Sequence, residues 1–181
     1  MLIFITGVAG SGKSTLCENL AGRGLRAYDA DDEISRHVRI ADGVPVASPP
    51  RHEQTPQWVR EHEFRFDLGR LCAIAAQATP EEPAFVLGAA YGDCEAVKLA
   101  DLAFYLHVDR AELGRRLAGR SPDAYGSAPH ELESIFTWHA SAADRYERLG
   151  ARRLDASRPA GQIADELLAV ALGAPRGTVR G

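Results

Sequence analysis

The chain has 181 residues, of which 45% are hydrophobic and 25% are charged, fractions typical of a globular protein and long enough for one well-packed domain. Its formal net charge of −4 excludes a broad basic face for non-specific nucleic-acid binding, and three scattered cysteines indicate reduced thiols. We therefore expect a single domain over residues 1–181, with no nucleic-acid partner, no membrane partner and a cytoplasmic location.

The first predicted element is a strand over residues 2–6, because Leu2–Thr6 is an apolar run of strand length. It leads directly into residues 7–15, which read Gly-Val-Ala-Gly-Ser-Gly-Lys-Ser-Thr. These residues form a complete G-x-x-x-x-G-K-[ST] motif, and a helix is predicted from Lys13 to about Arg23. Strand, glycine-rich turn and helix follow one another in the order that this phosphate-binding motif requires.

The residue types of this loop suit a nucleoside triphosphate bound with Mg²⁺. Its glycines allow positive φ angles and leave no Cβ in the way of a phosphate. The backbone N–H groups and the helix N-terminus then favour an anion. Lys13 is expected to reach the β- and γ-phosphates, and the Ser14 hydroxyl to ligate Mg²⁺. The predicted cofactor-binding residues of the loop are Gly7, Ala9, Gly10, Ser11, Gly12, Lys13, Ser14 and Thr15.

A short second strand over residues 25–28 leads into the acidic segment Asp29-Ala-Asp31-Asp32-Glu33. A carboxylate beside a phosphate loop can hold the water shell of a metal ion, which is the role expected of Asp29. Asp31, two residues later, can take the proton of a hydroxyl as a phosphoryl group arrives. The alternative is a solvated acidic turn that caps the next helix, and this suits Asp32 best. That helix is predicted over residues 32–39.

Residues 42–56 are rich in Pro and Gly, so no regular element is predicted there, and such long irregular segments tend to be binding loops. A helix is predicted from Pro56, capped by Thr55, to about residue 78. We expect residues 42–78 to form a substrate-binding loop and helix. Packing or simple solvation explains individual side chains there equally well. The candidate pocket residues are Arg51, His52, Trp58, Arg60, His62 and Arg65.

Strands and helices alternate along the rest of the chain, which predicts a parallel α/β sheet with right-handed crossovers. Residues 173–181 are predicted to be a flexible tail. The predicted strands cover residues 84–87, 102–108 and 151–154, and the predicted helices cover residues 93–99, 109–120, 129–148 and 159–172.

Three segments resemble the P-loop small-molecule and nucleoside-monophosphate kinases, the group that contains adenylate, shikimate, gluconate and dephospho-coenzyme A kinases. The first segment is the phosphate loop. The second is the Asp29-x-Asp31 pair, which is similar to the D-x-D of shikimate, gluconate and dephospho-coenzyme A kinases. The third is Arg116-Leu-Ala-Gly-Arg120, which is similar to R-L-x-G-R at the lid of adenylate kinases. The resemblance covers the whole chain. It implies a three-layer P-loop NTPase fold with a five-stranded parallel sheet, helices on both faces and a short lid over about residues 115–130.

The resemblance also implies roles for three arginines. In this kinase group the lid arginines close over the transferring phosphate, and a bidentate, permanently charged side chain suits that role. Arg116 and Arg120 lie four residues apart and can face the same way on a helix. Arg158 follows the last strand, where the chain of these kinases runs past the adenine, and an arginine there can stack on the base. Helix-start chemistry around Ser157 explains the same segment equally well.

One departure concerns the acceptor. Adenylate kinases carry an Asp-Gly-x-Pro-Arg-like sequence after the third strand, whereas this chain has Gly88-Ala-Ala-Tyr-Gly-Asp93 there, with no arginine. We therefore predict a monomeric or homodimeric enzyme that uses ATP and Mg²⁺ to phosphorylate a hydroxyl of a small molecule. Two alternatives stay open: a nucleoside or nucleoside-monophosphate kinase, and an ATP-binding regulatory NTPase that acts through a partner protein. The predicted catalytic residues are Lys13, Asp31, Arg116 and Arg120.

Overall fold

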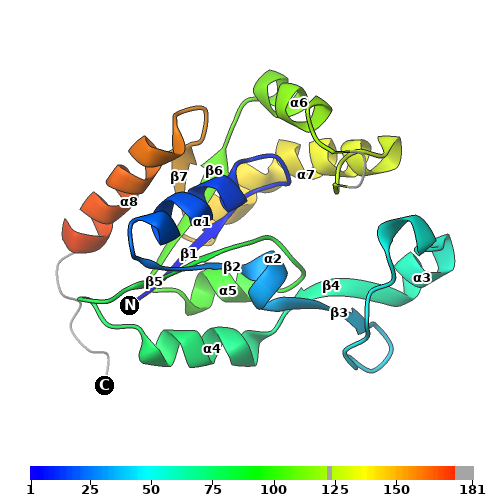
Figure 1. The fold of residues 1–181 in the computed structure, drawn as a ribbon, viewed down its shortest axis with the longest axis horizontal. Coiled ribbons are helices and arrows are strands. Elements are labelled where there is room, and N and C mark those ends of the chain that lie inside the picture. Colours follow the sequence, from blue (N-terminus) through cyan, green and yellow to red (C-terminus); the bar gives the residue numbers. More distant parts are fainter. Residues whose placement is uncertain (122–123, 174–181) are drawn as a thin grey trace.

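A computed structural model of the chain describes residues 1–121 and 124–173. Its main sheet has five parallel strands in the order β2-β5-β1-β6-β7 (Figure 1). The central strands are buried along their whole length, as expected for apolar strands between two layers of helices. The predicted parallel α/β sheet is therefore confirmed. Its strands are β1 (Leu2–Thr6), β2 (Arg26–Asp29), β5 (Ala84–Leu87), β6 (Leu102–His107) and β7 (Arg152–Asp155).

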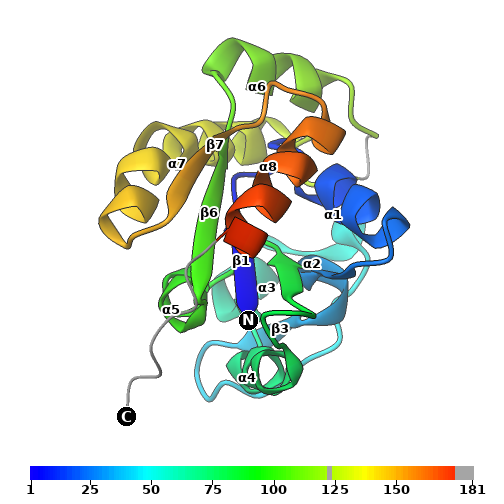
Figure 2. The same cartoon turned by 90° about the vertical axis from the view of Figure 1, so that its left-hand side faces the viewer.

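Helices cover both faces of this sheet, which gives the predicted three layers. On one face lie α1 (Lys13–Gly22) and α8 (Ala160–Gly173), which pack against each other. On the other face lie α5 (Asp93–Leu99) and α7 (Pro129–Arg148) (Figure 2). The tail predicted over residues 173–181 falls, apart from its first residue, outside the described part of the chain.

The segment between β2 and β5 differs from its prediction. The helix expected over residues 32–39 is wrong, because α2 (Ala30–Glu33) ends after one turn and β3 (Ser35–Arg39) follows it. The helix expected over residues 56–78 is also wrong. It divides into α3 (Pro56–Glu61), β4 (His62–Phe66) and α4 (Leu68–Gln77).

The two strands of this segment pair with each other in an antiparallel hairpin, in which Ser35 lies opposite Phe66 and Arg39 opposite His62. Their backbone groups are satisfied by partners more than twenty residues away, so a local helical pattern was a poor guide. A cap at Asp67, whose side chain accepts a hydrogen bond from the Arg70 N–H, begins a new helix at Leu68. This cap was the sequence signal that the long predicted helix overlooked.

Between β3 and α3 the chain is irregular apart from the short 3₁₀ turn η1 (Arg51–Glu53), as predicted. The other insertion follows α6 (Arg110–Ala118) and leads to α7. The short lid was predicted in this region, and residues 122–123 lie outside the described part of the chain.

Candidate active site

A cleft with a volume of about 1740 Å³ lies where the chain leaves the carboxyl ends of the parallel strands. This edge is where open α/β sheets place their ligands. We call one side of the cleft the nucleotide half, which comprises the phosphate loop at residues 7–15 with Arg116, Arg120, Arg158 and the start of α8. We call the other side the acceptor half. It comprises Asp31 and the cleft-lining residues within 37–68, 89–95 and 125–146.

The phosphate loop joins β1 to α1 and has the shape of an anion cradle. Gly10 and Gly12 have φ angles of 87° and 102°, a conformation that side chains with a Cβ rarely adopt. The Ser11 hydroxyl is buried in this loop and finds no hydrogen-bond partner among the described residues. A buried polar atom without a partner is costly, so a phosphate oxygen at the loop fits what the fold provides.

Lys13 lies at the first turn of α1, with only 9% of its surface exposed. Its Nζ donates hydrogen bonds to the carbonyls of Gly7, at 2.7 Å, and Val8, at 3.3 Å. Burial lowers the pKa of this ammonium, while the carboxylates of Asp31 and Asp29 act in the opposite direction. The charge is therefore held inside the loop, within reach of any phosphate that the loop binds.

The carboxylate of Asp31 stands opposite this lysine, on the acceptor side. Asp29 caps α2 by accepting a hydrogen bond of 3.1 Å from the Asp31 N–H, and the Asp31 Oδ1 in turn accepts one of 3.5 Å from the Ala89 N–H. Burial raises the pKa of Asp31, and the attraction of Lys13 opposes this only in part. A carboxylate with a raised pKa is a stronger base, which suits proton transfer from a hydroxyl. Asp29 itself does not line the cleft.

A close approach between β5 and α2 places Asp31 in this position. A Cβ on Gly88 would lie 2.5 Å from the Ala30 Cβ and 3.3 Å from the Asp31 Oδ1. The first of these contacts is far shorter than carbon atoms normally adopt, and the second is tight. The absence of a side chain at Gly88 is therefore what lets the acidic turn pack against the end of β5.

The two arginines predicted for the lid, Arg116 and Arg120, both line the cleft, but their surroundings differ. Arg116 donates to Glu112 Oε1 at 2.6 Å, to the Ser11 carbonyl at 3.2 Å and to the Ala156 carbonyl at 2.8 Å. It thus ties the phosphate loop to the segment after β7. Arg120 is exposed and donates to the Tyr125 carbonyl at 2.6 Å.

Arg158 also lines the nucleotide half, and there it forms an ion pair with Glu166. Its Nε donates to the Asp155 carbonyl at 3.2 Å, while the Ser157 N–H donates to the Asp155 carboxylate at 2.9 Å. The helix-start chemistry is therefore present, in addition to the position of Arg158 in the cleft lining.

The acceptor half receives most of the pocket residues suggested by the sequence. Arg51, Trp58, His62 and Arg65 line it, Arg60 does not, and the side chain of His52 lies outside the described part. The rings of Trp58 and His62 stack with centroids 4.6 Å apart and an interplanar angle of 17°.

Two groups of residues on this side were missed by the sequence reasoning. One is His37, which meets Trp58 edge-on at 4.8 Å because β3 and β4 pair. The other is a stripe along α7 that faces the cleft at i, i+4 spacing and consists of His130, Ser134, Trp138, Ala142 and Tyr146. Trp138 is 54% exposed, so it does not serve core packing. The helical spacing of this stripe was visible in the sequence, but the face on which it lies was not.

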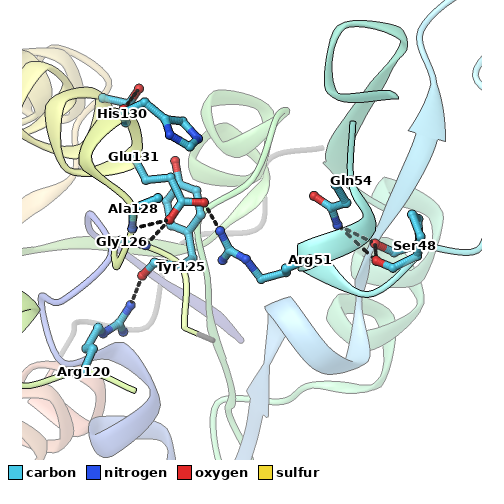
Figure 3. A network of polar contacts seen from close by, with 11 residues as sticks. Ser48, Arg51, Gln54, Arg120, Tyr125, Gly126, Ala128, His130 and Glu131 are labelled. Carbon is cyan, nitrogen blue, oxygen red and sulfur yellow. Dashed lines mark hydrogen bonds and ion pairs between the residues drawn. The ribbon is translucent and has the colours of Figure 1, made fainter. Parts of the chain in front are cut away.

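A polar bridge crosses the cleft from the irregular loop to the lid (Figure 3). Arg51 of η1 forms an ion pair with Glu131 of α7, and its guanidinium lies 5.1 Å from the centre of the Tyr125 ring. The other oxygen of the Glu131 carboxylate accepts hydrogen bonds from the N–H groups of Gly126, at 2.9 Å, and Ala128, at 3.3 Å. The two insertions of the fold therefore meet above the cleft.

The described residues provide neither a ready-made cluster of metal ligands nor a membrane-spanning helix. Within 1–121 and 124–173, no three His, Cys, Asp or Glu side chains come close enough together to hold a metal ion. Over the same ranges, no helix is both long and apolar enough to cross a membrane. A magnesium ion held mainly by phosphates and by the exposed Ser14 hydroxyl needs no such cluster of side chains.

Comparison with known proteins agrees with this geometry. A family model described as an AAA domain matches residues 3–136. No curated protein matches the sequence. Among solved structures, a shikimate kinase from Acinetobacter baumannii in complex with shikimate is similar, with a TM-score of 0.61 and 15% identity over 97% of this chain and 95% of that chain. A sugar kinase from a Janibacter species is also similar, with a TM-score of 0.53 and 17% identity over 93% and 92% of the two chains. The expected P-loop kinase fold is thereby confirmed.

Proposed function

Because the chain belongs to the AAA domain family and folds as P-loop kinases do, we propose that it transfers the γ-phosphoryl group of ATP to a hydroxyl of a small molecule. The observation that carries this proposal is the continuity of the cleft. The phosphate loop and the carboxylate of Asp31 lie in one cavity, which extends past them into an acceptor half. A protein that only hydrolysed ATP would need no such second half.

We assign the following roles in phosphoryl transfer to residues of the chain. Bound ATP and Mg²⁺ would supply the phosphoryl group and neutralise part of its charge. Residues 7–15 would hold the phosphates, with the Ser14 hydroxyl as a metal ligand and Asp29 acting on the metal's water shell. Lys13 and Arg120 would neutralise charge on the transferring group. Asp31 would orient the acceptor hydroxyl and take its proton at the carboxylate.

Arg116 would act differently from Arg120, because its guanidinium already braces the phosphate loop against the segment after β7. We assign it the role of holding the loop in shape. Arg158 would flank the base of the nucleotide. The use of ATP rather than another nucleotide, the location in the cytoplasm, the single-domain organisation and a monomeric or homodimeric state stay predictions.

The proposal is tested by ADP formation with Mg²⁺ and a panel of nucleosides, nucleotides, sugars, sugar acids and amino alcohols. We expect one class to raise ADP formation well above the rate without acceptor. Asp31→Asn should lose this stimulation and keep ATP binding, whereas Asp32→Asn, a matched change on the neighbouring exposed carboxylate, should keep both. Equal ADP formation with and without every acceptor, together with capture of a stable protein partner, would instead support the regulatory alternative.

A further inference from the structure

The two halves of the cleft differ in charge. In the described part of the chain, the nucleotide half is lined by four basic side chains, Lys13, Arg116, Arg120 and Arg158, and by no carboxylate. The acceptor half has three arginines but five carboxylates, so it carries a formal excess of two negative charges when all five are ionised. The arginines are Arg51, Arg65 and Arg145, and the carboxylates are Asp31, Glu63, Asp93, Glu95 and Glu131.

Each arginine of the acceptor half is already paired with one of these carboxylates. Arg51 pairs with Glu131 and Arg65 pairs with Glu63. Arg145 pairs with Asp93 at 3.0 Å.

Two of the carboxylates, Glu131 and Asp93, are buried, with 9% and 7% of their surfaces exposed. An anionic ligand that bound Arg51 or Arg145 would deprive one of these buried carboxylates of its ion-pair partner, which is costly. Burial and the neighbouring His62 lower the pKa of His37, which disfavours a positive charge on its ring.

Apolar surface is concentrated in the same half. Of the eight large hydrophobic residues that are exposed in the described part of the chain, five line the acceptor half. Exposed apolar surface gathered in one hollow usually marks a binding site rather than ordinary solvation. Three of the five are aromatic, and the cleft-lining Trp58 of α3 also contacts His37 of β3 edge-on and stacks on His62 of β4. The five residues are Val59, Leu68, Tyr91, Tyr125 and Trp138.

Resting on the phosphotransferase function proposed above, we infer that the acceptor half binds a hydroxyl compound that has an aromatic or other apolar body and carries no negative charge. An uncharged or cationic acceptor leaves the three arginine pairs intact, and a cation is further attracted by the surplus carboxylates. Sugar acids, carboxylated ring alcohols and nucleoside monophosphates are thereby disfavoured. This assignment separates the chain from the nucleoside-monophosphate kinases within its own fold.

The chain contains a built-in reporter for this inference. Its two tryptophans, Trp58 and Trp138, both line the acceptor half, so their fluorescence should respond to a ligand there. Suitable probes are 4-(hydroxymethyl)benzamide, 4-(hydroxymethyl)benzylamine and 4-(hydroxymethyl)benzoate, which share one hydroxyl and one ring but are neutral, cationic and anionic. The titrations are run with Mg²⁺ and a non-hydrolysable ATP analogue in place.

We expect the benzamide and the benzylamine to bind at least about tenfold more tightly than the benzoate, because like charges facing each other are strongly unfavourable. Equal or tighter binding of the benzoate would overturn the inference. So would the absence of a saturable change with all three probes at millimolar concentration.

A pair of variants tests the ion pairs themselves. Glu63→Gln removes one negative charge and frees Arg65, so the affinity for the benzoate should rise by about threefold to tenfold, as expected for one freed charge in a partly exposed site. Glu61→Gln is the matched control. Glu61 lies two residues away and outside the cleft lining, where it accepts a hydrogen bond from Gln57, and its replacement should leave all three affinities unchanged. An unchanged benzoate affinity in Glu63→Gln would contradict the inference.

Failure of this inference and failure of the kinase proposal are distinguishable by measuring ADP formation with the same probes. A protein that phosphorylates the benzoate in preference to the benzamide is a kinase for which the inference is wrong. A protein that binds the benzamide preferentially, but phosphorylates neither these probes nor any compound of the acceptor panel above, would support the charge preference and contradict the proposed kinase function.

Discussion

Replacement of Gly88 by alanine tests whether the close packing of β5 against α2 positions the carboxylate of Asp31. The new Cβ would lie 2.5 Å from the Ala30 Cβ, about 1 Å closer than a normal carbon–carbon contact. Neither atom is on a flexible side chain, so the acidic turn must move. Overpacking of this kind costs about 1–3 kcal/mol. For a domain of this size that corresponds to a fall in melting temperature of about 2–12 °C.

The same displacement should also slow phosphoryl transfer. The Asp31 Oδ1 is held by the Ala89 N–H at 3.5 Å, directly after the substituted position, so the carboxylate should move away from its place in the cleft. A misplacement of about 1 Å can lower the rate of a positioned reaction by about 100-fold. We therefore expect Gly88→Ala to bind ATP normally and to transfer the phosphoryl group much more slowly, as measured by calorimetric nucleotide titration and by ADP formation.

Gly22→Ala is the matched control, because a Cβ there meets no atom within 4 Å and the residue lies at the end of α1. This replacement should stabilise the protein by about 0.4–1 kcal/mol and leave transfer unchanged. A Gly88→Ala protein that melts at the wild-type temperature and transfers at the wild-type rate would refute the argument.

Four further predictions concern the nucleotide half and Asp31. Lys13→Ala should weaken ATP binding by more than about tenfold, since a charge-assisted contact is lost, and isothermal calorimetry measures this. Because the folded state raises the pKa of Asp31 above its unfolded value of 3.8, folding favours the protonated form, and the free energy of unfolding falls as the pH rises through the folded pKa. Asp31→Asn should therefore melt at a higher temperature than the wild type at pH 7, with a gain that shrinks toward pH 4; a gain independent of pH would contradict this. Arg116→Ala should lower both the melting temperature and the ATP affinity, whereas Arg120→Ala should lower transfer alone; equal melting temperatures for the two variants would contradict the bracing role. Removal of Mg²⁺ with EDTA should abolish transfer, and added Mg²⁺ should restore it.

The parts of the fold that the sequence predicted correctly are those with strong local signals. The strand at residues 2–6, the glycine-rich turn and the helix from Lys13 follow from an apolar run and a motif, both of which involve near neighbours in the chain. The helix Pro129–Arg148 was also predicted with its observed bounds, because proline favours the first turn and the apolar spacing continues for twenty residues.

The parts that were predicted wrongly depend on distant partners. Residues 35–39 and 62–66 become strands because each satisfies the hydrogen bonds of the other, and neither segment contains a strong strand signal of its own. The same pairing brings His37 to the ring of Trp58. This ring contact in the acceptor half therefore could not be predicted from any local sequence pattern.

The local sequence by itself determined that this chain holds a phosphate cradle after its first strand and a pair of acidic residues after its second, because a loop's glycines and a strand's end are properties of consecutive residues. Only the tertiary structure decided what surrounds them. Arg51 and Glu131 are 80 residues apart in the chain, and their ion pair exists because two separate insertions close over one cleft. Whether a charged side chain is free to bind a substrate depends on such partners. The charge preference of the acceptor half therefore follows from the packed chain.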